Sequence, residues 1–167
     1  MINLGIIGCG WQTETTHLPV LQRFGGVRLY SACDTRIERL QLVEGVYRIR
    51  QLYSDWTDLI ADPALDAVLI ATPGDSHASL SAAAIAADKH VLVEKPFALT
   101  VAHAEALAGQ ARTAKVVSMV GLNFRFHPLA SELKATIQRG AIGRPLAVFT
   151  TMMSNQGQRI RDRKSVV

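Results

Sequence analysis

Lys95 has the clearest chemical potential in this 167-residue sequence, because it follows a short apolar run and precedes a proline. The run at residues 90–93 is typical of a buried strand, and Glu94-Lys95-Pro96 comes directly after it. A lysine at a strand end can stabilise an oxyanion, and desolvation can shift its pKa toward useful values. Oxidation of an alcohol needs such a group, since the hydroxyl proton must leave as hydride departs. A solvated surface lysine is the alternative.

Two glycines near the amino terminus predict a site for a phosphate group. Gly8 and Gly10 follow an apolar run at residues 4–7 and precede a helix-compatible segment. A side chain at Gly10 would block a pyrophosphate, and a helix N-terminus offers unpaired N–H groups to that anion. Thr13 stands where this pattern has a third small residue, which weakens it. A plain turn is the alternative.

Asp34 strengthens the prediction of a nucleotide site. It ends a plausible strand at residues 27–33, near the ~20-residue spacing at which an acid takes the ribose of a dinucleotide. An N-cap for the next helix is the alternative. Arg36 could meet a 2′-phosphate and permit NADP, but the charge of Asp34 opposes that phosphate, which favours NAD.

The elements that would position these residues alternate between strands and helices. Gly45 is expected to stop one helix, Asp55 or Ser54 to cap the next, and Thr100 to cap a third. Strands are expected at residues 48–53, 65–71, 115–120 and 145–153 besides those above, and helices at 35–45, 55–61, 76–88, 100–113 and 129–139.

This alternation predicts an α/β protein of Rossmann type, a doubly wound parallel sheet with right-handed crossovers. In the usual order the first, fourth and fifth strands are neighbours, and their carboxyl ends meet where the order reverses. The glycine turn, Thr72-Pro73 and Glu94-Lys95-Pro96 fall at those ends, with Asp34 and Asn123 to the sides. Turn residues without a common role would not need to converge on one edge.

Several segments together resemble one family. Gly8-Cys-Gly10 with His17, Ala32-Cys-Asp34, Ile70-Ala-Thr-Pro73 with His77, Glu94-Lys-Pro96 and the segment 121–128 are similar to the Gfo/Idh/MocA oxidoreductases, over residues 1–153. The resemblance implies NAD(P)-dependent hydride transfer on a sugar or polyol, with NAD as cofactor and NADP as the alternative. Gly74 departs from the family, which usually has Asn there.

The resemblance also implies site residues. Lys95 would be catalytic and touch the reacting hydroxyl, and the Lys95–Pro96 bond would be cis. The expected cofactor contacts are Gly8, Gly10, Trp11 and Gln12 at the diphosphate, Asp34 at the ribose, Thr72, Pro73 and His77 along the cleft, Glu94 near the nicotinamide, and Asn123 and Arg125 beneath it.

Some of these residues have plainer interpretations. His17 is expected to pack its helix or to make a cap contact. His77 could simply begin a helix, and Trp11 could pack onto the sheet rather than cover a diphosphate. No group of His, Cys and Asp has metal-ligand spacing, so no metal is predicted.

Composition limits the other function classes. The net charge is +4, but residues 159–164 hold four cations and one anion, so the remaining chain carries +1 and no basic stripe for nucleic acid. No run reaches the ~20 apolar residues of a membrane span. Cys9 and Cys33, without an evident leader, favour a reducing cytoplasm.

The end of the sequence suggests a second domain that is cut short. Residues 1–122 are expected to form the nucleotide-binding domain and 123–161 the start of a truncated α+β substrate domain. Residues 162–167 read like a translated sequencing adapter, with an ordinary basic C-terminus as the alternative. The intact protein is expected to be a homo-oligomer. A non-catalytic NAD(P) sensor is the rival function, and retention of Lys95 argues for the enzyme.

Overall fold

Six parallel strands form the sheet of the protein, described over residues 1–151 in a computed structural model. The tail predicted at residues 162–167 lies outside these residues. The strands are β1 (Ile2–Ile7), β2 (Val27–Cys33), β3 (Gln51–Tyr53), β4 (Ala67–Ile70), β5 (His90–Val93) and β6 (Ser118–Val120). Their order is β3-β2-β1-β4-β5-β6, so the predicted doubly wound sheet is confirmed, as is the adjacency of β1, β4 and β5.

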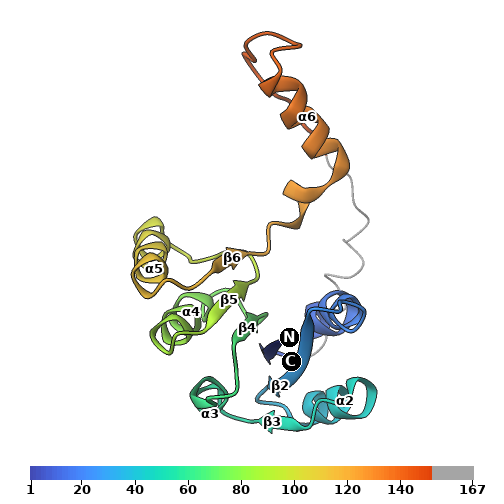
Figure 1. Cartoon of the computed structure of the whole chain (residues 1–167), viewed down its shortest axis with the longest axis vertical. Coiled ribbons are helices and arrows are strands. Elements are labelled where there is room, and N and C mark those ends of the chain that lie inside the picture. The colour runs from blue at the N-terminus through green and yellow to red at the C-terminus, as the bar shows by residue number, and fades with distance from the viewer. Residues whose placement is uncertain (152–167) are drawn as a thin grey trace. The chain divides into compact units, whose positions relative to one another are not determined.

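Helices cover both faces of this sheet (Figure 1). One face carries α3, α4 and α5, and the other carries α2 and the helical segment after β1. The bounds are η1 (Thr13–His17), a π-helix, followed by α1 (Leu18–Leu21), α2 (Ile37–Tyr47), α3 (Trp56–Ala61), α4 (His77–Ala86) and α5 (Val101–Ala114). Asp55 and Thr100 cap α3 and α5, accepting from the N–H groups of Thr57 and His103, as expected.

The core has two layers, one on each side of the sheet. Ile70 and Val93 pack with Leu80 and Leu107 of α4 and α5 in one layer. In the other layer Leu69 packs with residues of β1 and α2. Alternate residues of β4 therefore serve opposite layers, as a strand buried on both faces requires.

One predicted helix boundary is wrong. Gly45 does not stop α2, which continues to Tyr47. Arg48 ends it in the left-handed conformation, with φ 58°, and Ile49 beyond it is buried. The buried side chain after the cap gives the helix its stop, so no glycine is needed there.

The chain divides into two compact units, Met1–Leu122 and Asn123–Val167. Of the second unit, residues 123–151 are described, with η2 (Asn123–Phe126) and α6 (Pro128–Gln138). No described side chain of α6 is buried. The strand predicted at 145–153 is absent over residues 145–151, and the rest of it lies outside the described part. A single strand without a partner leaves its backbone groups unpaired, which explains its absence.

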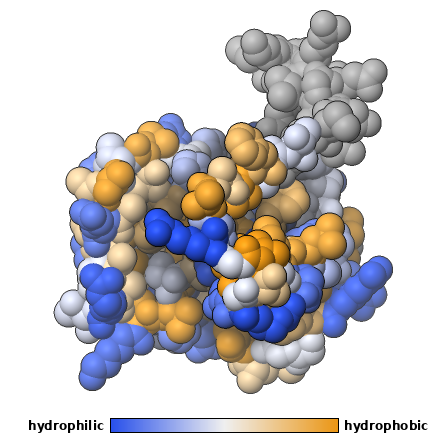
Figure 2. Space-filling model, turned by 90° about the horizontal axis from the view of Figure 1, so that it is seen from above, coloured by the Kyte–Doolittle hydropathy of each residue, from blue (hydrophilic) through white to orange (hydrophobic). Residues whose placement is uncertain are grey.

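The surface mixes apolar and polar side chains on the face drawn in Figure 2. Exposed apolar side chains are frequent in the second unit, where Phe124, Leu129 and Phe149 are among them. Within residues 1–151, no helix is long and apolar enough to cross a membrane.

Candidate functional site

The glycine turn after β1 has a backbone that only glycine fits. Gly8 has φ +94°, and a Cβ there would lie 2.8 Å from the carbonyl oxygen of Ala71. A Cβ on Gly10, in contrast, would meet nothing within 4 Å. Gly8 is therefore fixed by the fold, whereas Gly10 leaves open space in front of the following helix.

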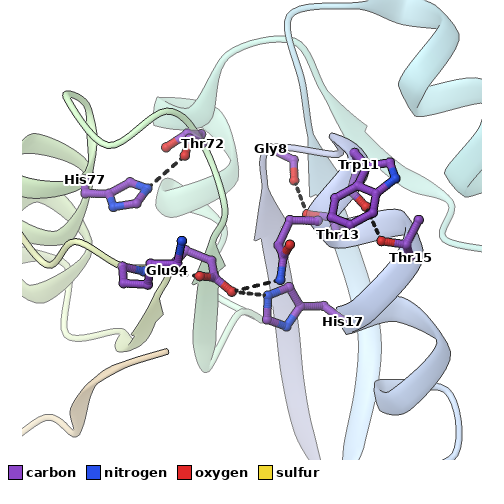
Figure 3. Close-up of polar contacts among 10 residues, drawn as sticks. Gly8, Trp11, Thr13, Thr15, His17, Thr72, His77 and Glu94 are labelled. Atoms are coloured by element: carbon purple, nitrogen blue, oxygen red, sulfur yellow. Dashed lines mark hydrogen bonds and ion pairs between the residues drawn. The ribbon is translucent and has the colours of Figure 1, made fainter. Parts of the chain in front are cut away.

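Thr13 fits the turn despite its size. Its side chain is fully buried, and its hydroxyl donates to the carbonyl oxygen of Gly8 at 2.6 Å. Thr15 makes a similar bond to the carbonyl oxygen of Trp11 at 2.8 Å (Figure 3). The hydroxyl of Thr13 thus ties the π-helix η1 to the turn that precedes it.

Asp34 braces the same turn from the end of β2. One carboxylate oxygen accepts from the N–H of Cys9 at 2.8 Å, and the other accepts from the N–H of Arg36 at 2.9 Å. The Nε of Arg36 lies 3.5 Å from that second oxygen. The N-cap alternative is wrong, since Arg36 occupies the N-cap position of α2.

A cavity of about 560 Å³ opens at the carboxyl ends of β1, β2 and β4. Of the predicted site residues, Gly8, Gly10, Asp34, Thr72 and Pro73 line it. Ser54, Trp56, Thr35, Ser76 and Ser79 also line it and were missed from the sequence. Ser54 and Trp56 follow the predicted strand β3 at the same edge of the sheet, and that position was the available signal.

A second cavity of equal volume lies between α4 and α5. Ala78, Ala82, Leu99 and Leu107 give it mostly apolar walls. None of its lining residues belongs to the glycine turn or directly follows a strand, whereas ligands of open α/β sheets bind at the strand ends. The cavity beside Gly8 and Asp34 is therefore the candidate site.

His77 joins the loops that follow β4 and β5. It begins α4, is 1% exposed, and has its ring nitrogens 2.7 Å from the carbonyl oxygen of Pro96 and 2.8 Å from that of Thr72. Both polar atoms of the ring thus face backbone carbonyls. The cis Lys95–Pro96 bond confirms the expectation from the resemblance.

The surroundings of Gly74 explain why a glycine stands where the family usually has Asn. A Cβ at this position would lie 3.1 Å from Cδ of Pro96. The glycine lets the Thr72-Pro73 turn approach the proline closely, so the two loops pack together beside the His77 contacts.

Glu94 turns toward the helix that follows β1, as Figure 3 shows. Its Oε1 lies 2.8 Å from Nε2 of His17 and 3.5 Å from Nε2 of Gln12, and its Oε2 accepts from the N–H of Lys95 at 3.2 Å. His17 therefore makes a contact between elements instead of the local packing or cap contact that was expected. The Lys95 side chain is exposed.

The two thiols near the turn are held in the protonated form. Burial, with the Asp34 carboxylate adding to it, raises the pKa of Cys9 to about 12 and that of Cys33 to about 11. Neither forms a disulfide. Within the described part of the chain, no group of His, Cys, Asp and Glu could hold a metal ion.

Asn123 and Arg125 belong to the second unit, where both lie in η2. The guanidinium of Arg125 lies 5.8 Å from the ring centre of Phe126.

Trp11, at the glycine turn, is 42% exposed, so it is not packed into the sheet as one interpretation had it.

The chain belongs to the oxidoreductase family with an NAD-binding Rossmann fold, the Gfo/Idh/MocA family, whose profile matches residues 2–122. It is 33% identical to a myo-inositol 2-dehydrogenase of Thermotoga maritima, over 86% of this chain and 43% of that protein. It is 36% identical to a D-apiose dehydrogenase of Paraburkholderia graminis, over 84% of this chain and 37% of that one.

Solved structures agree in fold. An NAD-binding oxidoreductase from Klebsiella pneumoniae matches with a TM-score of 0.76 and 34% identity, over 86% of this chain and 40% of that one. The chain thus spans less than half the length of these relatives.

Proposed function

We propose that this chain is the cofactor-binding part of an oxidoreductase that transfers hydride between a nicotinamide dinucleotide and a CH–OH group of a sugar or polyol. The observation that carries the proposal is the cavity lined by Gly8, Gly10 and Asp34 at the point where strand order reverses. The family and the similarity to two dehydrogenases of polyhydroxy compounds support the reaction class.

The cofactor contacts follow the chain from β1 outward. Gly8, Gly10, Trp11 and Gln12 are assigned to the diphosphate, because the open space at Gly10 and the adjoining helix start suit an anion. Asp34 is assigned to the adenosine ribose, since carboxylate oxygens accept from ribose hydroxyls. One oxygen accepts from the Cys9 N–H and the other from the Arg36 N–H, and each keeps a further lone pair that can accept from a ribose hydroxyl.

Lys95 is assigned the catalytic role. The bound nicotinamide supplies or accepts the hydride, while the Lys95 side chain touches the substrate oxygen. A cation there would stabilise the negative charge on that oxygen as the hydroxyl proton passes to solvent and hydride leaves the carbon. The residue favours an enzyme over a sensor, because a protein that only binds the cofactor has no need of this lysine.

Thr72 and Pro73 are assigned to the cleft wall, and Glu94 to the nicotinamide end. His77 would act on that end through Thr72 and Pro96, whose carbonyls it contacts. Asn123 and Arg125 stay assigned to the cofactor on the resemblance alone.

NAD is the preferred cofactor in this proposal. The Asp34 side chain is only 9% exposed, and its negative charge would repel a 2′-phosphate. Arg36 is the cation nearest that carboxylate, with its Nε 3.5 Å away. The chain by itself is expected to bind the cofactor with little or no turnover, because substrate positioning would depend on what the longer relatives have in addition.

Calorimetric titration with NAD+, NADH and their phosphorylated forms tests the proposal. The chain should bind NAD+ and NADH, and Asp34→Ala should weaken both by about tenfold or more, since hydrogen bonds to a charged group are lost. Asp34→Asn keeps one acceptor oxygen, which can serve the Cys9 N–H, and should reduce the preference for NAD+ over NADP+ because the negative charge is lost. Glu105→Ala, an exposed acid on α5, is the matched control. A folded chain that binds none of the four nucleotides would refute the proposal.

A further inference from the structure

His17 and Glu94 form a polar bridge between two elements that lie far apart in sequence. His17 ends η1, the helix after β1, and Glu94 follows β5 (Figure 3). The 2.8 Å contact between Nε2 and Oε1 is mostly shielded, with the two side chains 18% and 13% exposed. Shielded polar contacts fix geometry more firmly than exposed ion pairs, which solvent screens.

Three donors fix the Glu94 carboxylate. His17 and, at the longer distance of 3.5 Å, Gln12 point to Oε1, while the N–H of Lys95 bonds to Oε2. Neither oxygen is left without a partner. A carboxylate held on both oxygens orients the backbone of Lys95, which is the residue assigned to the reacting hydroxyl.

The bridge joins the diphosphate side of the crevice to its nicotinamide side. β1 and β5 are separated in the sheet by β4, so the contact between their following segments crosses the point of strand reversal. Gln12 lies in the turn assigned to the diphosphate, and Lys95 in the loop assigned to the nicotinamide. A displacement of Glu94 should therefore affect the nicotinamide end and leave the adenosine end intact.

We propose that His17 is a positioning residue that, through Glu94, holds the loop of Lys95 in place for the nicotinamide ring. The inference rests on the proposed function, because the nicotinamide end is assigned there. The chemistry required of position 17 is one N–H donor at the place of Nε2. Gln can supply that donor and Ala cannot.

Binding of NADH compared with binding of ADP-ribose, which lacks the nicotinamide ring, tests this role. His17→Ala should weaken NADH binding by about tenfold, the effect of losing one hydrogen bond to a charged group, and leave ADP-ribose binding within about twofold. His17→Gln should restore NADH affinity to within about threefold of wild type. Thr16→Ala, on the exposed side of the same helix, is the matched control.

A purely structural role for His17 would change both ligands equally, since its helix also borders the assigned diphosphate site. Equal weakening of NADH and ADP-ribose, or no change in either, overturns this inference while the proposed function stands. A wild-type chain that binds neither ligand overturns the proposed function and this inference together. Should His17→Ala fail to fold, His17→Leu, which is closer to histidine in volume and has no N–H donor, carries the same comparison and must weaken NADH alone.

Discussion

The two rims of the crevice are built by different means. The β1–β2 rim, with Gly8, Gly10 and Asp34, is fixed largely by backbone: a positive φ, a close approach to Ala71 and two N–H groups on one carboxylate. The β4–β5 rim, with Thr72, Pro73, Glu94 and Lys95, is held by the side chains of His17 and His77. One rim is thus specified by backbone conformation, and the other depends on side-chain contacts.

This difference fits the role that is proposed for each rim, which is cofactor binding for one and catalysis for the other. Binding of a diphosphate and a ribose needs a fixed cradle, which a turn and one acid can supply. Chemistry at Lys95 needs its loop placed against a ring and a substrate, to within a fraction of an ångström.

Gly8→Ala should have the largest effect, because it breaks the β1–β2 rim at its backbone. A positive φ costs a non-glycine residue roughly 1–3 kcal/mol, and the contact with the Ala71 carbonyl adds to this cost. We expect a loss of about 3 kcal/mol or more in the free energy of unfolding, measured by urea denaturation. A variant as stable as wild type would mean that the turn is free to rearrange.

Gly10→Ala separates folding from binding in the same turn. Its Cβ would meet no protein atom within 4 Å, so the stability should stay within about 0.5 kcal/mol of wild type. Affinity for NAD+ should fall by about tenfold or more, because the methyl group would occupy space assigned to the diphosphate. Calorimetry and urea denaturation on the same sample measure both, and unchanged affinity would place the diphosphate elsewhere.

His77→Ala should break the β4–β5 rim with a smaller loss of stability. It removes the ring that lies against the Pro96 and Thr72 carbonyls, and a neutral imidazole donates to one of the two. An unsatisfied buried group costs about 1–3 kcal/mol, so we expect a loss of about 2 kcal/mol in urea denaturation. His103→Ala, exposed on α5, should change nothing. Equal stabilities of the two variants would show that His77 does not hold the loops.

The distinction between local patterns and contacts distant in sequence explains what could be predicted from the sequence. Alternating strands and helices, the glycine turn and Asp34 are local patterns, and from them the doubly wound sheet and the adjacency of β1, β4 and β5 followed. The helix caps Asp55 and Thr100 were also local and were confirmed. A parallel sheet with crossovers has few alternative topologies, which is why the fold was predictable.

Contacts between residues distant in sequence leave no local pattern from which they could be predicted. His17 meets Glu94 across 77 positions, and nothing near either residue announces the partner. The stop of α2 at Arg48 depends on burial of Ile49, which local propensity does not report. Residues 145–151 have a strand pattern, but pairing needs a neighbour that the pattern cannot supply.

The smallest expected effect concerns Asp62, which braces the β2–β3 half of the sheet. Its Oδ2 accepts from the hydroxyls of Tyr30 and Tyr53, and its Oδ1 accepts from the N–H of Ala64. The Ala64 N–H, the two hydroxyls and Lys89 lower the pKa of Asp62 below its usual value of 3.8, against a smaller opposing effect of desolvation. A carboxyl whose pKa falls on folding stabilises the protein above the unfolded pKa, and this contribution disappears as pH drops through the folded pKa.

Asp62→Asn should therefore lower stability at pH 7 by about 1 kcal/mol or less, because the site is only partly buried. The difference from wild type should shrink as pH falls from about 5 toward 3, since wild-type Asp62 then becomes protonated. Urea denaturation across this range measures it, with Glu105→Gln, exposed on α5, as the control. Because Asp62 does not line the candidate cavity, NAD+ affinity at neutral pH should stay unchanged. A stability difference that is constant with pH would show that folding does not lower the pKa of Asp62.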